Sequence, residues 1–259
     1  MALYCKETGN PDGQVILFLH GGGVSGWMWD KQVDFFANYR VLVPDLESHG
    51  RSSEEHFISI QESARKVVEL AETKAPDKKV IIIGLSLGAQ ILVEILSTRP
   101  DIVSCAIINS ALVRPMPLTR KMIRPVFKMS YGLIQNKSFA RLQARQLYID
   151  DEYFESYFAD SKKTALPDLI RVIDSNMSYS LPESFQNARV KIMVLVGARE
   201  KGVMLKSARD MLKNNPSCKG YLVPGIGHGV SLADPILFNE IAKAWIENGN
   251  QPKGVVPIA

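Results

Sequence analysis

The sequence has few cysteines and no long apolar run. Its three cysteines, Cys5, Cys105 and Cys218, have no paired spacing, which argues against a disulfide framework and against a structural zinc site. No stretch approaches the roughly 18 uninterrupted apolar residues of a membrane-spanning helix. The N-terminus also lacks the apolar core and the small-residue cleavage site of a secretory signal. We therefore expect a cytoplasmic protein with no stable membrane insertion.

The charge balance shows no strong bias either. A net charge of +4 is too mild to indicate nucleic-acid binding by itself. The hydrophobic fraction of 46% and the charged fraction of 22% are ordinary for a globular protein. A length of 259 residues suits one α/β domain, or one such domain with an insertion. Residues 249–259 contain Gly, Pro and Asn without a periodic pattern, and we expect a loose tail there.

Short apolar runs alternate with amphipathic stretches along most of the chain. The runs are rich in β-branched residues and predict strands at 14–20, 39–44, 79–85, 103–109, 191–197 and 219–224. Residues 2–8 could add an edge strand. The amphipathic stretches predict helices at 58–75, 87–98, 204–214 and 235–248. This alternation predicts an α/β fold, with a mostly parallel central sheet and helices on both faces.

One region interrupts this alternation. From Arg114 to about Leu181 there is no convincing buried strand, but several helical stretches are rich in aromatic residues and Met. We interpret residues 114–181 as a helical cap, inserted into a core formed by residues 1–113 and 182–259. Such a cap would lie over the carboxyl edge of the sheet, where open α/β sheets bind their ligands.

The sharpest motif is Gly84-Leu85-Ser86-Leu87-Gly88, between a predicted strand and a predicted helix. An abrupt strand-to-helix turn forces the serine into a strained conformation that exposes its hydroxyl. Flanking glycines leave room for neighbouring backbone, and the helix N-terminus offers free N–H groups and a positive dipole end. This context favours Ser86 as a nucleophile over a capping serine in a glycine-rich turn.

A second glycine-rich loop, His20-Gly21-Gly22-Gly23, follows the strand predicted at 14–20. With the serine motif, it gives the chain a resemblance to the α/β-hydrolase family, which places such a loop beside its nucleophile. The resemblance implies an oxyanion hole formed by the N–H groups of Gly22 and Leu87. Losing one such donor typically raises the barrier by ~3 kcal/mol. A plain flexible turn is the alternative, and we expect His20 itself to be structural.

The resemblance also suggests the base and the acid. Among four histidines, His228 lies in Gly225-Ile226-Gly227-His228-Gly229 after the last predicted strand, where the family keeps its catalytic histidine. The family commonly has Gly-x-x-Asp after the preceding strand, and here Glu200 takes the aspartate position. Glutamate can orient an imidazole, but it could instead be a surface residue. Asp174 and Asp234 are the reserve candidates.

Another family pattern runs from Pro44 to Ser52 as PDLESHGRS. We interpret Asp45 and His49 in this segment as structural residues that brace a loop over the site by hydrogen bonds. The resemblance as a whole covers about residues 14–113 and 190–248.

The predicted cap has an unusual order of charges. Its first part carries only basic charges, and acidic residues then follow within a short stretch: Arg114, Arg120, Lys121, Arg124, Lys128, Lys137, Arg141 and Arg145, then Asp150, Asp151, Glu152, Glu155 and Asp160. We favour the interpretation that these helices face one another or water, over attraction of an anionic substrate or lipid surface. We expect the cap's apolar residues, including Met122, Phe127 and Met129, to form its own packing and a pocket roof.

These patterns predict a serine hydrolase that cleaves a small to medium carboxylic ester through an acyl-enzyme intermediate. Ser86 attacks, His228 transfers the proton and Glu200 orients His228. We expect a small-molecule acyl substrate, no cofactor, no metal, no nucleic acid, and a monomer or homodimer. An aminopeptidase, a thioesterase, a C–C hydrolase or lyase, and a non-catalytic ligand-binding protein remain open alternatives.

Overall fold

The computed structural model describes residues 3–258. Residues 1–2 and 259, which we expect to belong to the core, lie outside the described range. Residue 2 is also the first residue of the expected edge strand at 2–8. Eight strands form one sheet in the order β1-β3-β2-β4-β5-β6-β7-β8. Their bounds are β1 Cys5–Gly9, β2 Val15–Leu19, β3 Arg40–Pro44, β4 Val80–Leu85, β5 Val103–Asn109, β6 Lys191–Gly197, β7 Cys218–Val223 and β8 Val256–Pro257.

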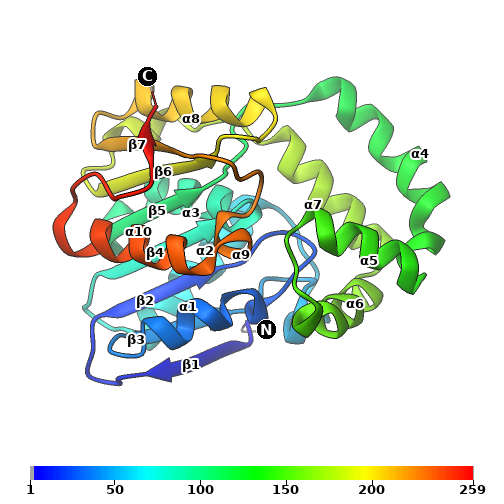
Figure 1. Ribbon diagram of the computed structural model, residues 1–259, viewed down its shortest axis with the longest axis horizontal. Coiled ribbons are helices and arrows are strands. Elements are labelled where there is room, and N and C mark those ends of the chain that lie inside the picture. Colours follow the sequence, from blue (N-terminus) through cyan, green and yellow to red (C-terminus); the bar gives the residue numbers. More distant parts are fainter. Residues whose placement is uncertain (1–2, 259) are drawn as a thin grey trace.

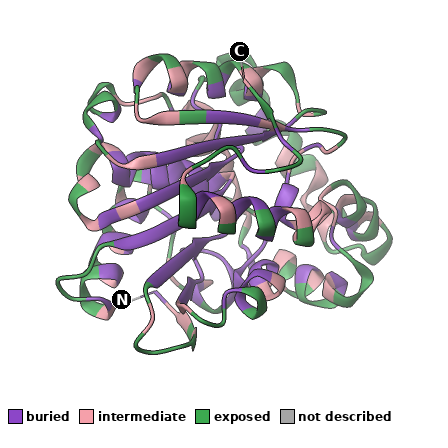
Figure 2. Ribbon diagram, turned by 60° about the vertical axis from the view of Figure 1, so that its left-hand side comes forward, coloured by how far each residue is buried: buried purple, intermediate pink, exposed green. Residues whose placement is uncertain are grey.

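The sheet is mostly parallel, as the sequence predicts. The strands β3, β2, β4, β5, β6 and β7 pair in parallel, and only the two edge strands, β1 and β8, are antiparallel to their neighbours. The middle strands are apolar because both faces are covered: β2 is buried along its whole length. Figure 2 shows these central strands as buried.

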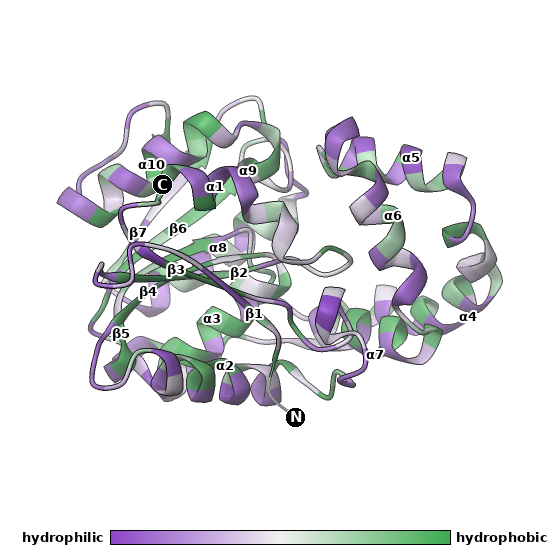
Figure 3. Ribbon diagram, turned by 90° about the horizontal axis from the view of Figure 1, so that it is seen from below, coloured by the Kyte–Doolittle hydropathy of each residue, from purple (hydrophilic) through white to green (hydrophobic). Residues whose placement is uncertain are grey.

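The helices outside residues 114–181 lie in two layers, one on each face of the sheet (Figure 3). One layer contains α2 Ile60–Lys74, α3 Leu87–Thr98 and α8 Gly202–Asn214, which pack into one apolar cluster with Leu17 of β2. The other contains α1 Asp30–Phe35, α9 Val230–Ala233 and α10 Pro235–Asn248, which pack with Ile16 and Phe18 of β2. Alternate residues of one strand therefore serve two separate cores.

Residues 114–181 contain four further α-helices and no strand. These are α4 Pro117–Ile134, α5 Lys137–Gln146, α6 Phe154–Lys163 and α7 Leu166–Ser178. They follow β5 and precede β6, and they stand to one side of the sheet, beyond α3 and α9 (Figure 1). Five short 3-10 helices complete the structure: η1 Gly26–Trp29, η2 Gly50–Ser52, η3 Pro100–Ile102, η4 Asp151–Tyr153 and η5 Glu183–Asn187.

The expectation of a loose tail over residues 249–259 is wrong for its described part. Val256 and Pro257 pair with β7, and the N–H of Ile258 donates to the carbonyl of Gly220 at 2.9 Å. Val255 is buried, so an apolar contact and backbone hydrogen bonds hold a segment whose sequence has no strand periodicity. Among residues 3–258, no helix combines the length and the apolar character that a bilayer crossing needs.

Candidate active site

Ser86 lies at the carboxyl end of β4, directly before α3. Its φ of 53° and ψ of −110° place it in a region that non-glycine residues rarely adopt. The two motif glycines make this turn possible. A Cβ on Gly84 would lie 2.4 Å from the carbonyl oxygen of Gly88, and a Cβ on Gly88 would lie 2.3 Å from that of Leu19. Only glycine fits at both positions, so the turn at Ser86 requires the two glycines together.

The loop after β2 lies beside this turn. A Cβ added to Gly21 would be 3.6 Å from Cβ of Ser86, and one added to Gly22 would be 3.9 Å from Cβ of Leu87. Leu87 is the first residue of α3, so its N–H has no acceptor within the helix. The residues of the predicted oxyanion hole, Gly22 and Leu87, are therefore neighbours, at the positive end of the α3 dipole.

The third element is a hydrogen-bonded pair of His228 and Glu200. Nδ1 of His228 lies 2.9 Å from Oε2 of Glu200, although the residues are 28 positions apart. The Glu200 side chain is only 3% exposed. Because a carboxylate only accepts hydrogen bonds, it places the imidazole hydrogen on Nδ1 and leaves Nε2 as an acceptor. The pair thus has the geometry of a base and its orienting acid.

A residue that the sequence analysis missed, Ser110, also binds Glu200. Its hydroxyl donates to Oε1 of Glu200 at 2.5 Å, and the N–H of Gly197 donates to the same oxygen at 3.2 Å. Ser110 directly follows β5 and has a φ of 59°. The sequence does contain a signal for this residue, because the polar pair Asn109-Ser110 stands at the end of an apolar strand. We interpret Ser110 as a positioning residue for the carboxylate.

These contacts connect the loops at the carboxyl edge of the sheet. The N–H of Ser86 donates to the carbonyl of Asn109, whose neighbour Ser110 holds Glu200, which in turn holds His228. Within the described residues, however, the Ser86 hydroxyl makes no hydrogen bond to His228. Catalytic hydrogen bonds are often long in ligand-free proteins and shorten when substrate binds.

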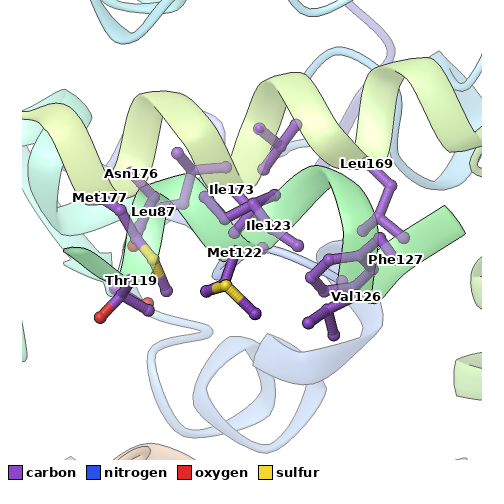
Figure 4. Close-up of a pocket in the computed structure, with 14 residues that line it drawn as sticks. Leu87, Thr119, Met122, Ile123, Val126, Phe127, Leu169, Ile173, Asn176 and Met177 are labelled. Atoms are coloured by element: carbon purple, nitrogen blue, oxygen red, sulfur yellow. The ribbon is translucent and has the colours of Figure 1, made fainter. Parts of the chain in front are cut away.

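An apolar cavity of about 420 Å³ opens at Ser86, between α4 and α7 (Figure 4). Its lining contains no charged residue; the polar side chains are those of Ser86, Thr119 and Asn176. The remaining lining comes from both glycine-rich turns and from the facing sides of the two helices: Gly22, Gly23, Leu87, Met122, Ile123, Val126, Phe127, Leu169, Val172, Ile173 and Met177. The cavity therefore suits an uncharged, apolar group of a ligand, next to the ligand atom that contacts Ser86.

Asp45, His20 and His49 brace the loops around the site, as expected from their motifs. The Asp45 carboxylate accepts hydrogen bonds from the N–H groups of Gly26 and Arg51, each at 2.8 Å. Nε2 of His20 accepts from the N–H of Leu46 at 2.9 Å, so its Nδ1 donates to the carbonyl of Gly21. Nδ1 of His49 lies 2.7 Å from the carbonyl of Glu47. None of the three lines the cavity.

The two buried histidines predict sensitivity to acid. Burial lowers the pKa of His20 and that of His49 from the usual 6.5 to about 4. Below pH 6.5 the unfolded chain therefore binds protons that the folded chain does not. The contribution of the two histidines to the free energy of unfolding should be fully present above this pH. It should decline as the pH drops towards 4, by on the order of 3 kcal/mol for His20. Urea unfolding at several pH values would measure the decline.

The matched comparison replaces the two buried histidines one at a time. His20→Gln should flatten the pH dependence of the unfolding free energy, whatever its effect at neutral pH. His49→Gln should flatten it as well, because burial lowers the pKa of His49 to the same value, about 4. Equal slopes for the wild type and His20→Gln would contradict the assignment.

The other predicted acids are placed elsewhere. Asp174 forms an ion pair with Arg120, which lowers its pKa, and Asp234 accepts a hydrogen bond from the N–H of Leu237 at the start of α10. Within the described residues, neither forms a hydrogen bond or an ion pair with His228. Ion pairs such as Lys137–Glu155 join basic and acidic parts of residues 114–181, as favoured above.

Residues 114–181 are also tied to the loop that follows the glycine turn. Asp160 of α6 accepts from the Ser25 hydroxyl at 2.6 Å and from Nε1 of Trp27 at 2.8 Å. Trp27 stacks on Tyr153, whereas Trp29 is fully buried in the core. The two tryptophans thus have packing roles, and neither lines the cavity.

Comparison with known proteins identifies related chains. Residues 16–241 match the model of the alpha/beta hydrolase family. An AB hydrolase superfamily protein of Gibberella zeae is 26% identical over 97% of this chain and 87% of its own length. A pimeloyl-(acyl-carrier protein) methyl ester esterase of Vibrio cholerae is 33% identical over 40% of this chain and 38% of its own length. A solved carboxylesterase structure from the thaumarchaeon Nitrososphaera gargenis superposes with a TM-score of 0.77 at 17% identity, over 94% of this chain and 93% of that one.

Proposed function

Because the chain belongs to the alpha/beta hydrolase family, we propose that it is a serine hydrolase of small to medium carboxylic esters. The observation that carries the proposal is the hydrogen-bonded pair of His228 and Glu200 at the same sheet edge as the strained turn at Ser86. The partial similarity to a methyl ester esterase agrees with this substrate class. In this proposal residues 114–181 act as a cap on a core of residues 1–113 and 182–259.

The first step forms an acyl-enzyme. The hydroxyl oxygen of Ser86 attacks the ester carbonyl carbon while Nε2 of His228 takes its proton. The tetrahedral intermediate carries a negative oxygen, which the N–H groups of Gly22 and Leu87 stabilise. The C–O bond to the alcohol then breaks, and the alcohol leaves with the proton from His228. Glu200 stabilises the imidazolium that forms between these events.

The second step releases the acid. Water attacks the acyl carbon, His228 accepts its proton, and the ester bond to Ser86 breaks as the proton returns to the serine oxygen. In both steps Nε2 of His228 comes within hydrogen-bond reach of the Ser86 oxygen in the occupied site. The acyl chain occupies the apolar cavity between α4 and α7, so the alcohol leaves on the side of His228.

A panel of p-nitrophenyl esters from acetate to octanoate, beside amino-acid anilides, tests this function. We expect kcat/KM to rise about three- to fourfold per added CH2 until the cavity is filled, because each buried CH2 is worth about 0.8 kcal/mol. An ester whose acyl chain ends in a carboxylate should react more slowly than its apolar counterpart of equal length, because no cation lines the cavity. Faster turnover of anilides than of esters would overturn the substrate class.

A further inference from the structure

Helix α4 has a row of apolar side chains that face solvent. Their spacing of four, four, three and four residues places them on one face of the helix. They are exposed by 43% to 87%: Leu118 79%, Met122 57%, Val126 43%, Met129 87% and Leu133 50%. The expectation that Met129 takes part in the packing of the cap is therefore wrong. We call these five residues the apolar row.

The apolar row is continuous with the cavity at Ser86. Met122 and Val126 belong to both, since they are exposed and also line the cavity. Figure 4 shows Thr119, Met122 and Val126 projecting from the same side of α4. Leu118, Met129 and Leu133 extend the row beyond the cavity lining. An apolar path thus runs from the surface of α4 to the proposed nucleophile.

The same helix carries positive charge only. Its four cations are Arg120, Lys121, Arg124 and Lys128, and it has no acidic residue. Arg120 is paired with Asp174, and Arg124 also lies near this carboxylate. Within residues 3–258, no ion pair involves Lys121 or Lys128. These two lysines are seven positions apart, so they lie on one strip of the helix, next to the apolar row.

We propose that the apolar row and the two lysines form a docking surface for an anionic lipid membrane. An amphipathic helix with apolar residues on one face and cations beside them lies in the plane of such an interface. The apolar side chains enter the acyl boundary, and the lysines approach lipid phosphates. Met122 and Val126 then open the cavity towards the lipid, from which an ester enters. Only this delivery rests on the proposed function; the docking surface does not.

Charge argues for lipid rather than a second copy of the chain. Two copies joined through the same face would bring Lys121 and Lys128 of one chain close to the same lysines of the other. An anionic surface neutralises these charges instead. On the side of the apolar row away from the lysines, where the row meets the cavity, the lining residues carry no charge.

Flotation with vesicles tests the proposal. We expect the protein to bind vesicles of equimolar phosphatidylcholine and phosphatidylglycerol much more tightly than pure phosphatidylcholine. The triple variant L118S/M129S/L133S should weaken this binding by about tenfold or more, because it removes buried apolar surface. The variant K121Q/K128Q should weaken it about 25-fold and reduce its salt dependence, because each lysine loses its attraction to the anionic surface.

Two matched controls and one activity assay make the test decisive. I236S removes an equally exposed apolar side chain from α10, and K213Q removes an exposed lysine from α8; both should bind like the wild type. All variants should keep the wild-type kcat/KM for a soluble short-chain ester, which shows that they are folded.

Three outcomes would overturn the docking surface. They are wild-type protein that binds neither vesicle, variants that bind as well as the wild type, and a triple variant that turns a dimer into a monomer without affecting vesicle binding. Ser86→Ala should still bind anionic vesicles. Vesicle binding without any esterase activity would therefore contradict the proposed function and leave the docking surface intact.

Discussion

Replacing Ser86 with alanine is expected to lower kcat for ester hydrolysis by about 100,000-fold. The hydroxyl is the only group in the proposed site that bonds to the acyl carbon, so its loss stops both steps. KM should change little, because the other 13 residues that line the cavity with Ser86 are unchanged. Steady-state kinetics with an active-site titration measure the effect.

A fluorophosphonate probe gives an independent measurement of the same prediction. The wild type should be labelled at Ser86, and Ser86→Ala should not be labelled at all. Ser217→Ala is the matched control, because Ser217 lies in the turn before β7 and lines no part of the cavity. Labelling of Ser86→Ala at wild-type rate would contradict the nucleophile. No labelling of the wild type would favour a ligand-binding protein.

The second large effect concerns Glu200. Glu200→Gln should lower kcat by about 10,000-fold, because an amide can donate to Nδ1 of His228 and so favour the wrong tautomer. Glu200→Asp should retain more activity, since it keeps the charge but shortens the reach to His228. The pH dependence of kcat separates the two variants from a general loss of folding.

Two other carboxylates serve as controls for Glu200. Asp174→Asn and Asp234→Asn should keep wild-type kcat, because the carboxylates bind Arg120 and the N–H of Leu237 rather than His228. Asn also caps helices well, so Asp234→Asn should stay folded. A loss in either control comparable to that of Glu200→Gln would mean that another carboxylate is the acid.

The sequence predicted the strands well because their environment leaves few alternatives. A strand covered on both faces must be apolar, as β2 is along its whole length and β6 is after Lys191. The helices α3 and α10 have the predicted bounds, since a glycine or proline marks an end of each. The short helix α1 and the strand β8 were missed, because neither is long enough to show a period.

The site itself was partly open to prediction. A local motif specified the turn at Ser86, because the steric conflict that requires glycine involves residues within four positions and the adjoining β2 loop. The contact between Ser110 and Glu200 joins residues 90 positions apart, so only the fold reveals it. The sequence likewise did not reveal that one apolar side of α4 is exposed. An apolar period does not show whether the apolar face of a helix packs against another element.

The two edge strands have a consequence for the behaviour of the protein in concentrated solution. An unpaired outer strand offers free N–H and C=O groups to other chains and so promotes self-association. On one side the protein ends its sheet with β1, which carries Lys6 and Glu7. On the other it ends with β8, which has only two residues, one of them Pro257 without an N–H donor. The last described residues thus limit edge-to-edge pairing of the sheet with other chains.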